Sequence, residues 1–351
     1  MSNFFTQKNE ERTKHRTKSL FLLAVTLVFS LSSSAMLVSA SDKGTLLILG
    51  DSIATGHSLP DYDSSGNPKS EYSWATLLSK AYGAEQVNLA VDGDTTSDLL
   101  SVVQNTANRK AISEAKVICV SIGGNNFLQL MGRLIDEDKI SLEGEVESAY
   151  LSMQAAAKND LDGIFTVLRK INPHAEVLVQ TMFEPYRYFT VPISQEKTVG
   201  DWMGSYVARY NTLLREKAEQ YGHTVVDVAE TFRVEGTQSW LYASMTEGTP
   251  EEAIVAIAQA NPHPTREGHQ GIFEAYRDTA DSILSAAFVS DGDSENTTET
   301  AQQESIDSES TASDTFKAEE VDGCGSSIGV ATSAMAVVAG MVTVFKRKKQ
   351  D

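Results

Sequence analysis

The chain has 351 residues, 41% of them hydrophobic, and its formal net charge is −19. This length accommodates one large domain with appendages, and so acidic a chain is a poor candidate for binding nucleic acid. The two cysteines predict no internal disulfide, because we expect Cys119 in a buried strand and Cys324 close to the C-terminus. No residue spacing is typical of a metal site, so we expect neither a metal nor a cofactor.

Residues 1–40 have the pattern of a signal peptide. Several lysines and arginines precede an apolar segment from Leu20 to Ala40, which ends in the small-residue sequence Val38-Ser39-Ala40. This pattern is typical of a cleaved export signal. The apolar segment is longer than average, so an uncleaved membrane anchor stays open as the alternative. Either version predicts that the following domain lies outside the cell.

Residues 41–290 are expected to form one folded domain in which strands and helices alternate. Apolar runs predict strands at 45–50, 86–91, 116–122, 175–182 and 223–228. Helical patterns fall between them, at 72–82, 94–107, 145–171, 200–221 and 266–288. This alternation predicts an α/β fold with a parallel sheet covered by helices on both faces.

The first predicted strand leads directly into Gly50-Asp51-Ser52. A serine in this position lies at the carboxyl edge of the sheet, where ligands bind in open α/β folds. Serine is a weak nucleophile, so it needs a base within hydrogen-bond reach and donors for the developing oxyanion. We expect Asp51 to order the turn rather than to take part in the chemistry.

Three further segments supply groups of this kind, in chain order. The stretch 88–95 ends an apolar run at Gly93, and the third strand opens into Gly123-Gly124-Asn125-Asn126. Near the end of the domain comes Asn261-Pro262-His263-Pro264. Since several of these residues follow predicted strands, they are expected to meet at one edge of the sheet.

With these four blocks the sequence resembles the SGNH family, also called GDSL-type esterases and lipases, over residues 44 to 288. The four marker residues of the family correspond here to Ser52, Gly93, Asn125 and His263. The resemblance implies a flavodoxin-like three-layer α/β/α sandwich with about five parallel strands. It also implies a serine esterase, and together with the ends of the chain it predicts an extracellular, membrane-anchored member from a Gram-positive-type bacterium.

The family chemistry assigns a role to each marker. Ser52 is the expected nucleophile, and His263 takes its proton and later returns it to the leaving alcohol. The oxyanion hole is expected to consist of the backbone N–H groups of Ser52 and Gly93 and the side-chain amide of Asn125.

Two positions depart from the family pattern. The aspartate that usually stands three residues before the histidine is Ala260 here, and Asn261 stands two residues before His263. A neutral amide can orient an imidazole but stabilises imidazolium poorly, so a Ser-His dyad and a degraded site both stay open. The second departure is Asn126, where the family commonly has an aspartate of structural importance.

Aromatic residues crowd the segment after the fourth predicted strand and the connection before His263. The first group could form an acyl or sugar wall or could simply pack the loop: Phe183, Tyr186, Tyr188, Phe189 and Trp202. Trp240 and Tyr242 in the later connection are candidates for a lid over the site.

The C-terminal part predicts a tether. Residues 291–322 contain eleven acidic residues and almost no aromatics, which is typical of a flexible stalk that cannot fold. Residues 323–351 contain an uncharged apolar stretch followed by Lys346-Arg347-Lys348-Lys349, which predicts a membrane-spanning helix with a cytoplasmic C-terminus. Cys324, just before that stretch, is a candidate point of processing or lipid attachment.

Three functions stay open at this point. The first is an extracellular esterase that removes short acyl groups, including those on carbohydrates. The second is a lysophospholipase or thioesterase on the same scaffold. The third is a binding module at the cell surface that has kept the fold without the activity. A small ester, an acylated glycan or a lysolipid is accordingly the expected substrate, with the membrane contacted only through the C-terminal helix.

Overall fold

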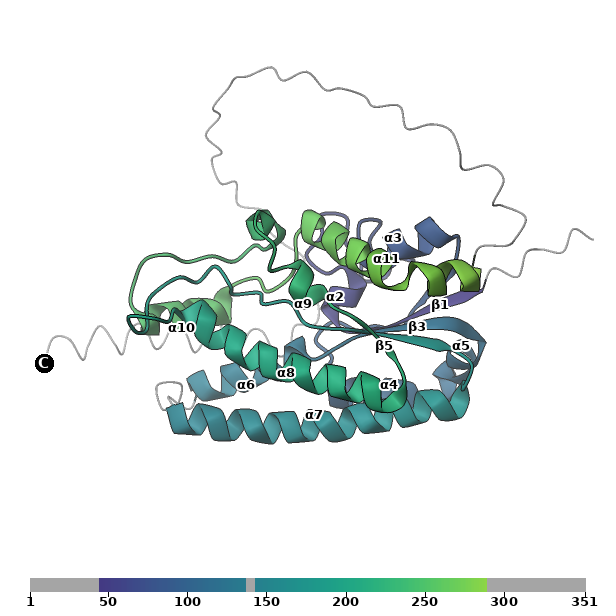
Figure 1. Cartoon of the computed structure of the whole chain (residues 1–351), viewed down its shortest axis with the longest axis horizontal. Helices are drawn as coiled ribbons and strands as arrows, with labels where there is room; N and C mark the ends of the chain where they lie inside the picture. The colour runs from purple at the N-terminus through teal and green to yellow at the C-terminus, as the bar shows by residue number, and fades with distance from the viewer. Residues whose placement is uncertain (1–43, 137–142, 289–351) are drawn as a thin grey trace, which may run out of the picture. The chain divides into compact units, whose positions relative to one another are not determined.

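The structure is a computed structural model that describes residues 44–136 and 143–288 (Figure 1). The predicted signal peptide (1–40), stalk (291–322) and anchor (323–351), with Cys324, lie outside the described residues. Within the two described ranges, no helix combines the length and the apolar character that crossing a membrane requires.

Five strands form one entirely parallel sheet in the order β2-β1-β3-β4-β5. This confirms the predicted α/β fold with about five parallel strands. The strands are β1 (Thr45–Gly50), β2 (Glu85–Asn88), β3 (Ala115–Ser121), β4 (Glu176–Gln180) and β5 (Thr224–Val226).

The second strand ends at Asn88, three residues before the predicted end. The Asn88 side chain accepts the backbone N–H of Ala90 at 2.9 Å, which turns the chain out of the strand. The backbone N–H groups of Leu89 and Val91 still donate to β1, to the carbonyls of Ile48 and Gly50 at 2.9 and 3.1 Å. The segment after β2 therefore stays beside β1 without being a regular strand.

The long helices agree closely with the predicted ranges, whereas several shorter ones were not predicted. The predicted helices are α3 (Trp74–Tyr82), α4 (Thr96–Gln104), α7 (Glu143–Ile171), α8 (Val199–Tyr221) and α11 (Arg266–Phe288). The others are α2 (Ser52–Thr55), η2 (Thr106–Asn108), α5 (Arg109–Glu114), α6 (Gly124–Asp136), α9 (Val228–Thr231), η3 (Thr237–Trp240) and α10 (Pro250–Gln259).

The start of α10 and the end of α4 differ from the predicted ranges, and residues at both places explain the difference. Helix α10 begins with Pro250 after a capping box formed by Thr249 and Glu252, which is a recognisable helix start. Helix α4 ends three residues before the predicted limit because Asn105 leaves the helical conformation and its side chain caps η2 through the N–H of Ala107.

Alternate residues of β1 belong to the two faces of the sheet. Leu46 and Ile48 pack into a core with α2, α3, α9 and α11, and Leu47 and Leu49 pack into another with α4, α6, α7 and α8. All four leucine and isoleucine side chains are fully buried, as expected for a parallel strand covered on both faces. The chain is thus a three-layer α/β/α sandwich, as Figure 1 shows. Cys119 in β3 is buried as predicted, and burial raises the pKa of its thiol.

The strand order reverses between β1 and β3, and in such sheets ligands bind at the carboxyl ends of the strands at that point. Gly50 ends β1 with φ +153, and a Cβ there would lie 2.1 Å from the carbonyl oxygen of Ser121 at the end of β3. Only glycine allows so close an approach. The chain that follows Gly50 therefore starts at the switch point.

Candidate active site

Asp51 organises the turn on which Ser52 lies. Its carboxylate is 2% exposed and accepts the backbone N–H of Ile53 at 3.0 Å, which caps the short helix α2. Burial raises the pKa of Asp51 to about 7, with the charges of Asp94 and Asp92 adding to the rise and the Ile53 hydrogen bond opposing it. This structural role is the one expected for Asp51.

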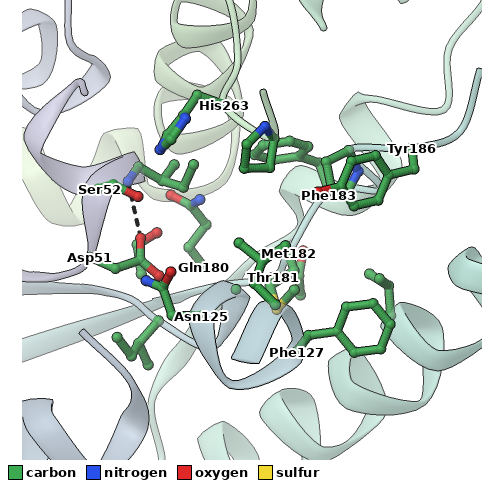
Figure 2. A pocket seen from close by; sticks show the side chains of 18 residues that line it. Asp51, Ser52, Asn125, Phe127, Gln180, Thr181, Met182, Phe183, Tyr186 and His263 are labelled. Carbon is green, nitrogen blue, oxygen red and sulfur yellow. Dashed lines mark hydrogen bonds between the residues drawn. The ribbon is translucent and has the colours of Figure 1, made fainter. Parts of the chain in front are cut away.

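One pocket brings Ser52, Asn125 and His263 together at the carboxyl edge of the sheet. It encloses about 60 Å³, and most of its other walls are apolar. Figure 2 shows the imidazole of His263 directed toward Ser52, with Asn125 on the opposite side near Asp51. The apolar lining of the pocket includes Ile122, Phe127, Leu128, Met182, Phe183, Pro185 and Val207.

His263 lies in the loop between α10 and α11, where Asn261 holds it. The side-chain oxygen of Asn261 is 2.7 Å from Nδ1 of His263 and also accepts the backbone N–H of His263 at 3.0 Å. Since that backbone group can only donate, the contact identifies the amide oxygen and assigns the imidazole proton to Nδ1. Nε2 is then the unprotonated nitrogen, as a general base requires.

Burial, together with the charge of the neighbouring His57, lowers the pKa of His263 to about 4, and the charge of Asp92 opposes the shift. The imidazole is therefore neutral at pH 7. A hydroxyl, Ser58 Oγ, lies 3.2 Å from the same Nδ1. Ser58 has φ +71, the single non-glycine residue with positive φ in the described part of the chain.

The two remaining oxyanion candidates occupy different places. Asn125, in the first turn of α6, lines the pocket, and its amide donates to the carbonyl of Asp94 at 3.0 Å. One amide hydrogen remains for another acceptor. Gly93 is exposed and does not line the pocket, but it precedes Asp94 in the same turn. Its φ is +87 and a Cβ there would meet nothing within 4 Å, so its backbone can be approached closely.

Asn126, the second departure from the family pattern, joins two helices. Its side-chain oxygen accepts the backbone N–H of Thr96 at 3.0 Å, and its amide donates to the Thr96 hydroxyl at 2.9 Å. The hydroxyl of Thr96 in turn donates to Asp160 in α7 at 2.7 Å. The asparagine thus makes structural contacts with α4.

A sequence model of the GDSL-like Lipase/Acylhydrolase family matches residues 48–270. The chain belongs to this family. This confirms the resemblance drawn from the four sequence blocks. Members of this family are lipases and acylhydrolases, which are enzymes that hydrolyse ester bonds.

Individual relatives of this GDSL-like hydrolase are distant. It is 24% identical over 116 residues to the uncharacterized protein YpmR of Bacillus subtilis (strain 168), a match that covers 33% of this chain and 43% of YpmR. A phospholipase A1 from Streptomyces albidoflavus NA297 is similar in structure, with a TM-score of 0.49 and 20% identity over 68% of this chain and 100% of that one. An extracellular lipase from Streptomyces rimosus has a TM-score of 0.49 and 19% identity, covering 67% and 99% of the two chains.

Sequence reasoning did not single out His57, which lies beside His263, or Asp92, which contacts His57. Nδ1 of His57 lies 3.1 Å from a carboxylate oxygen of Asp92, and the His57 ring lies 4.9 Å from that of His263. His57 follows the serine motif and Asp92 precedes Gly93, so each is next to a recognised block. No local pattern in the sequence indicates that the two meet.

The aromatic candidates divide between the pocket and the core. Phe183 and Tyr186 line the pocket, whereas Phe189 is buried outside it. Trp202 packs edge-on against Tyr206. The Tyr188 hydroxyl lies 3.3 Å from that of Thr237. The wall expected after the fourth strand therefore comes from two of the five candidates.

The two lid candidates also differ from each other. Trp240 packs against Phe232 and against Gly271 of α11, where a Cβ would lie 2.4 Å from the indole ring. It is thus a packing residue rather than a lid. Tyr242 is 46% exposed and its hydroxyl donates to the carbonyl of Ser58 at 3.4 Å, so it lies at the rim of the site.

Two further histidines of the described residues have a packing or a surface position. His269 is fully buried, accepts the backbone N–H of Trp74 at 3.3 Å, and has a pKa that burial lowers to about 3. His174 is exposed. Among residues 44–136 and 143–288, no three His, Cys, Asp or Glu side chains form a group that could hold a metal ion.

Proposed function

We propose that this hydrolase is a serine esterase in which Ser52 is the nucleophile and His263 the general base. The observation that carries the proposal is the shared pocket of Ser52, Asn125 and His263, with Nδ1 of His263 held by Asn261. A base that is neutral at pH 7 and has Nε2 unprotonated is ready to accept the serine proton.

The proposed reaction has two halves. Ser52 Oγ bonds to the acyl carbon while its proton moves to Nε2 of His263, and the carbonyl oxygen becomes an oxyanion bound by the N–H groups of Ser52 and Gly93 and the amide of Asn125. The bond to the alcohol then breaks and the alcohol leaves with the proton from His263. Water repeats the sequence on the acyl-serine, releasing the acid and regenerating Ser52.

Asn261 takes the place of the missing aspartate in this proposal. Its oxygen fixes the ring and the tautomer of His263, which are two of the roles that the acid plays in a Ser-His-Asp triad. As a neutral group it contributes little to stabilising the imidazolium that forms during the reaction. The catalytic unit is thus a Ser-His dyad oriented by an amide.

Short acyl groups are the substrates that the pocket favours. The cavity of about 60 Å³ is small, so it suits a short acyl group better than a long chain. The carboxylates of Asp92 and Asp94 lie beside the site. Together with the net charge of −19, they disfavour anionic substrates and surfaces. Acetyl to butyryl esters of neutral alcohols, such as carbohydrates, fit these conditions better than lysolipids do. Action outside the cell stays a prediction from residues 1–40 and 323–351.

The test is hydrolysis of p-nitrophenyl esters from acetate to laurate by the full-length chain. We expect kcat/KM to be greatest for acetate to butyrate and to fall by at least about tenfold at laurate. Ser52→Ala and His263→Ala should each lose about 10⁴-fold or more in kcat while keeping the circular dichroism of the wild type. Ser97→Ala, which removes an exposed hydroxyl on α4, is the matched control. Turnover by Ser52→Ala at the wild-type rate would refute the mechanism, and a maximum at laurate would refute the short-acyl assignment.

A further inference from the structure

A second histidine lies against the proposed base. His57 and His263 come from loops that are far apart in the sequence, and their ring centroids are 4.9 Å apart at an interplanar angle of 45°. The side chain of His57 is 43% exposed, whereas His263 is half-buried and faces the pocket. His57 therefore lies between the base and solvent.

Asp92 holds His57 from the other side. One carboxylate oxygen contacts Nδ1 of His57 at 3.1 Å and also accepts the Tyr62 hydroxyl. The other oxygen accepts the hydroxyl of Thr55 at 2.5 Å. Burial would raise the pKa of Asp92, but the hydrogen bonds from His57, Thr55 and Tyr62 outweigh it and hold the pKa well below its ordinary value. The carboxylate is thus ionised at neutral pH.

His263 lacks the carboxylate that a Ser-His-Asp triad would supply. The carboxylate of Asp92 and the imidazole of His57 lie nearby instead. Asn261, which orients His263, is neutral, so the charge of the imidazolium must be balanced by other groups. The charge of Asp92 raises the pKa of His263 and that of His57 lowers it. The two neighbours therefore act on the base in opposite directions.

We propose that His57 and Asp92 form a positioning pair for His263, in which neutral His57 leaves the Asp92 charge available to the imidazolium and protonated His57 cancels it. The proposal rests on the role of His263 as general base. His57 and Asp92 need not touch the substrate; they act through His263.

The groups around the pair define its charge. Three groups face His57: Asp92 from the turn after β2, Tyr62 from the loop after α2 and His263 from the loop before α11. The hydrogen bond with Asp92 raises the pKa of His57 above its ordinary value, burial opposes this rise, and the Asp92 charge adds to it. As pH falls, His57 consequently gains its proton before His263, whose pKa is about 4.

The expected signature is an acid limb of kcat/KM with two steps. The upper step follows protonation of His57 and lowers kcat/KM about fivefold to tenfold, because a positive charge about 5 Å away opposes formation of the imidazolium. The lower step, near pH 4, follows protonation of His263 and abolishes turnover. A purely structural role of His57 would change the overall rate or the stability but would not create the upper step.

The experiment measures kcat/KM for p-nitrophenyl acetate from pH 3 to 9 with the full-length chain and three variants. His57→Gln keeps an amide donor for Asp92 but cannot titrate, so we expect only the lower step to remain. Asp92→Asn should lower the plateau about tenfold and move the upper step to lower pH, because His57 loses its carboxylate. His174→Gln removes an exposed imidazole elsewhere on the surface and should reproduce the wild-type profile.

A second readout does not depend on turnover. Titration of the histidine rings by ¹H–¹⁵N NMR should show a higher pKa for His263 in His57→Gln than in the wild type, and a lower one in Asp92→Asn. If His57→Gln does not fold, the shifted upper step and the lowered His263 pKa of Asp92→Asn test the same coupling.

The outcomes separate this inference from the proposed function. Ser52-dependent turnover with two steps in the wild type and one in His57→Gln supports both. Ser52-dependent turnover with identical profiles in the wild type and His57→Gln leaves the esterase intact and overturns the positioning pair. Turnover that persists in Ser52→Ala refutes the serine mechanism, and an unchanged His263 titration in both variants then rejects the pair as well.

Discussion

The two halves of the pocket are built in different ways. Ser52 and Asn125 lie in the first turns of α2 and α6, which begin just after β1 and β3, so hydrogen bonds of the sheet and of these helices hold them. His263 and its neighbours come from loops, and their contacts join residues 35 and 205 positions apart. The half that contains Ser52 and Asn125 is thus part of the scaffold. The half that contains His263 is instead held by contacts between side chains of separate loops. We expect changes in the first half to affect rate and fold stability, and changes in the second to alter the pH dependence.

The largest effect beyond the loss of Ser52 or His263 should come from Asn125→Ala. Removing one preorganised donor from an oxyanion hole typically costs about 10²–10³-fold in kcat, and KM should change little because the donor acts mainly in the transition state. Steady-state kinetics with p-nitrophenyl acetate measure both constants. Asn126→Ala is the matched control, since the neighbouring amide contacts Thr96 rather than the pocket and should leave kcat within about threefold. A similar kcat for both variants would remove Asn125 from the oxyanion hole.

Asp51→Asn should change how the free energy of unfolding of the protein depends on pH. Burial raises the pKa of Asp51 to about 7 from an ordinary 3.8, so between these values the folded protein binds more protons than the unfolded chain. Its contribution to the free energy of unfolding is fully present below about pH 4 and is lost as pH rises through about 7, by on the order of a few kcal/mol. Asparagine also caps helices well, so the variant should keep α2 and lose less stability between pH 4.5 and 7.5.

Urea unfolding at several pH values measures this difference. The exposed carboxyl of Asp278 in α11 provides a control, and Asp278→Asn should keep the wild-type pH dependence. Parallel stability curves for the wild type and Asp51→Asn would show that Asp51 stays ionised in the folded protein.

Asn261→Asp should produce the smallest of the three effects, and it bears on the loop half. A carboxylate 2.7 Å from Nδ1 of His263 would stabilise the imidazolium and raise the pKa of the ring. We expect kcat/KM above pH 7 to rise several-fold and the acid limb to move to higher pH. Asn261→Ala, which removes the orienting oxygen, should instead lower kcat/KM about tenfold. Profiles that coincide with the wild type for both variants would exclude Asn261 from the catalytic unit.

Much of the fold could be predicted from the chain because its signals are local. The apolar run 45–49 and its counterparts predicted all five strands, and their alternation with helices predicted the parallel sheet. The end of β2 was predicted three residues late because the apolar run continues to Val91, while the Asn88 side chain ends the regular pairing. Helix α6 was missed because it begins within the Gly123-Gly124-Asn125-Asn126 motif, which has the composition of a loop.

The site was predictable to the extent that it belongs to strand ends. Ser52 and Asn125 were expected to meet because parallel strands bring their carboxyl ends to one edge, and the structure places both in one pocket. Trp240 illustrates the limit of such reasoning. Its position before His263 suggested a lid, but its contacts with Phe232 and α11 pack it, partly buried, against the core.

By itself, the sequence determined the succession of the strands and long helices along the chain, the family, and the residues that follow strands at the carboxyl edge. These features depend on hydrophobic periodicity and short motifs, which act over a few residues. Only the tertiary structure decided which oxygen orients His263 and that His57 and Asp92 lie beside it. Those contacts depend on the conformations of separate loops, and a loop's conformation is set by what it packs against rather than by its own residues alone.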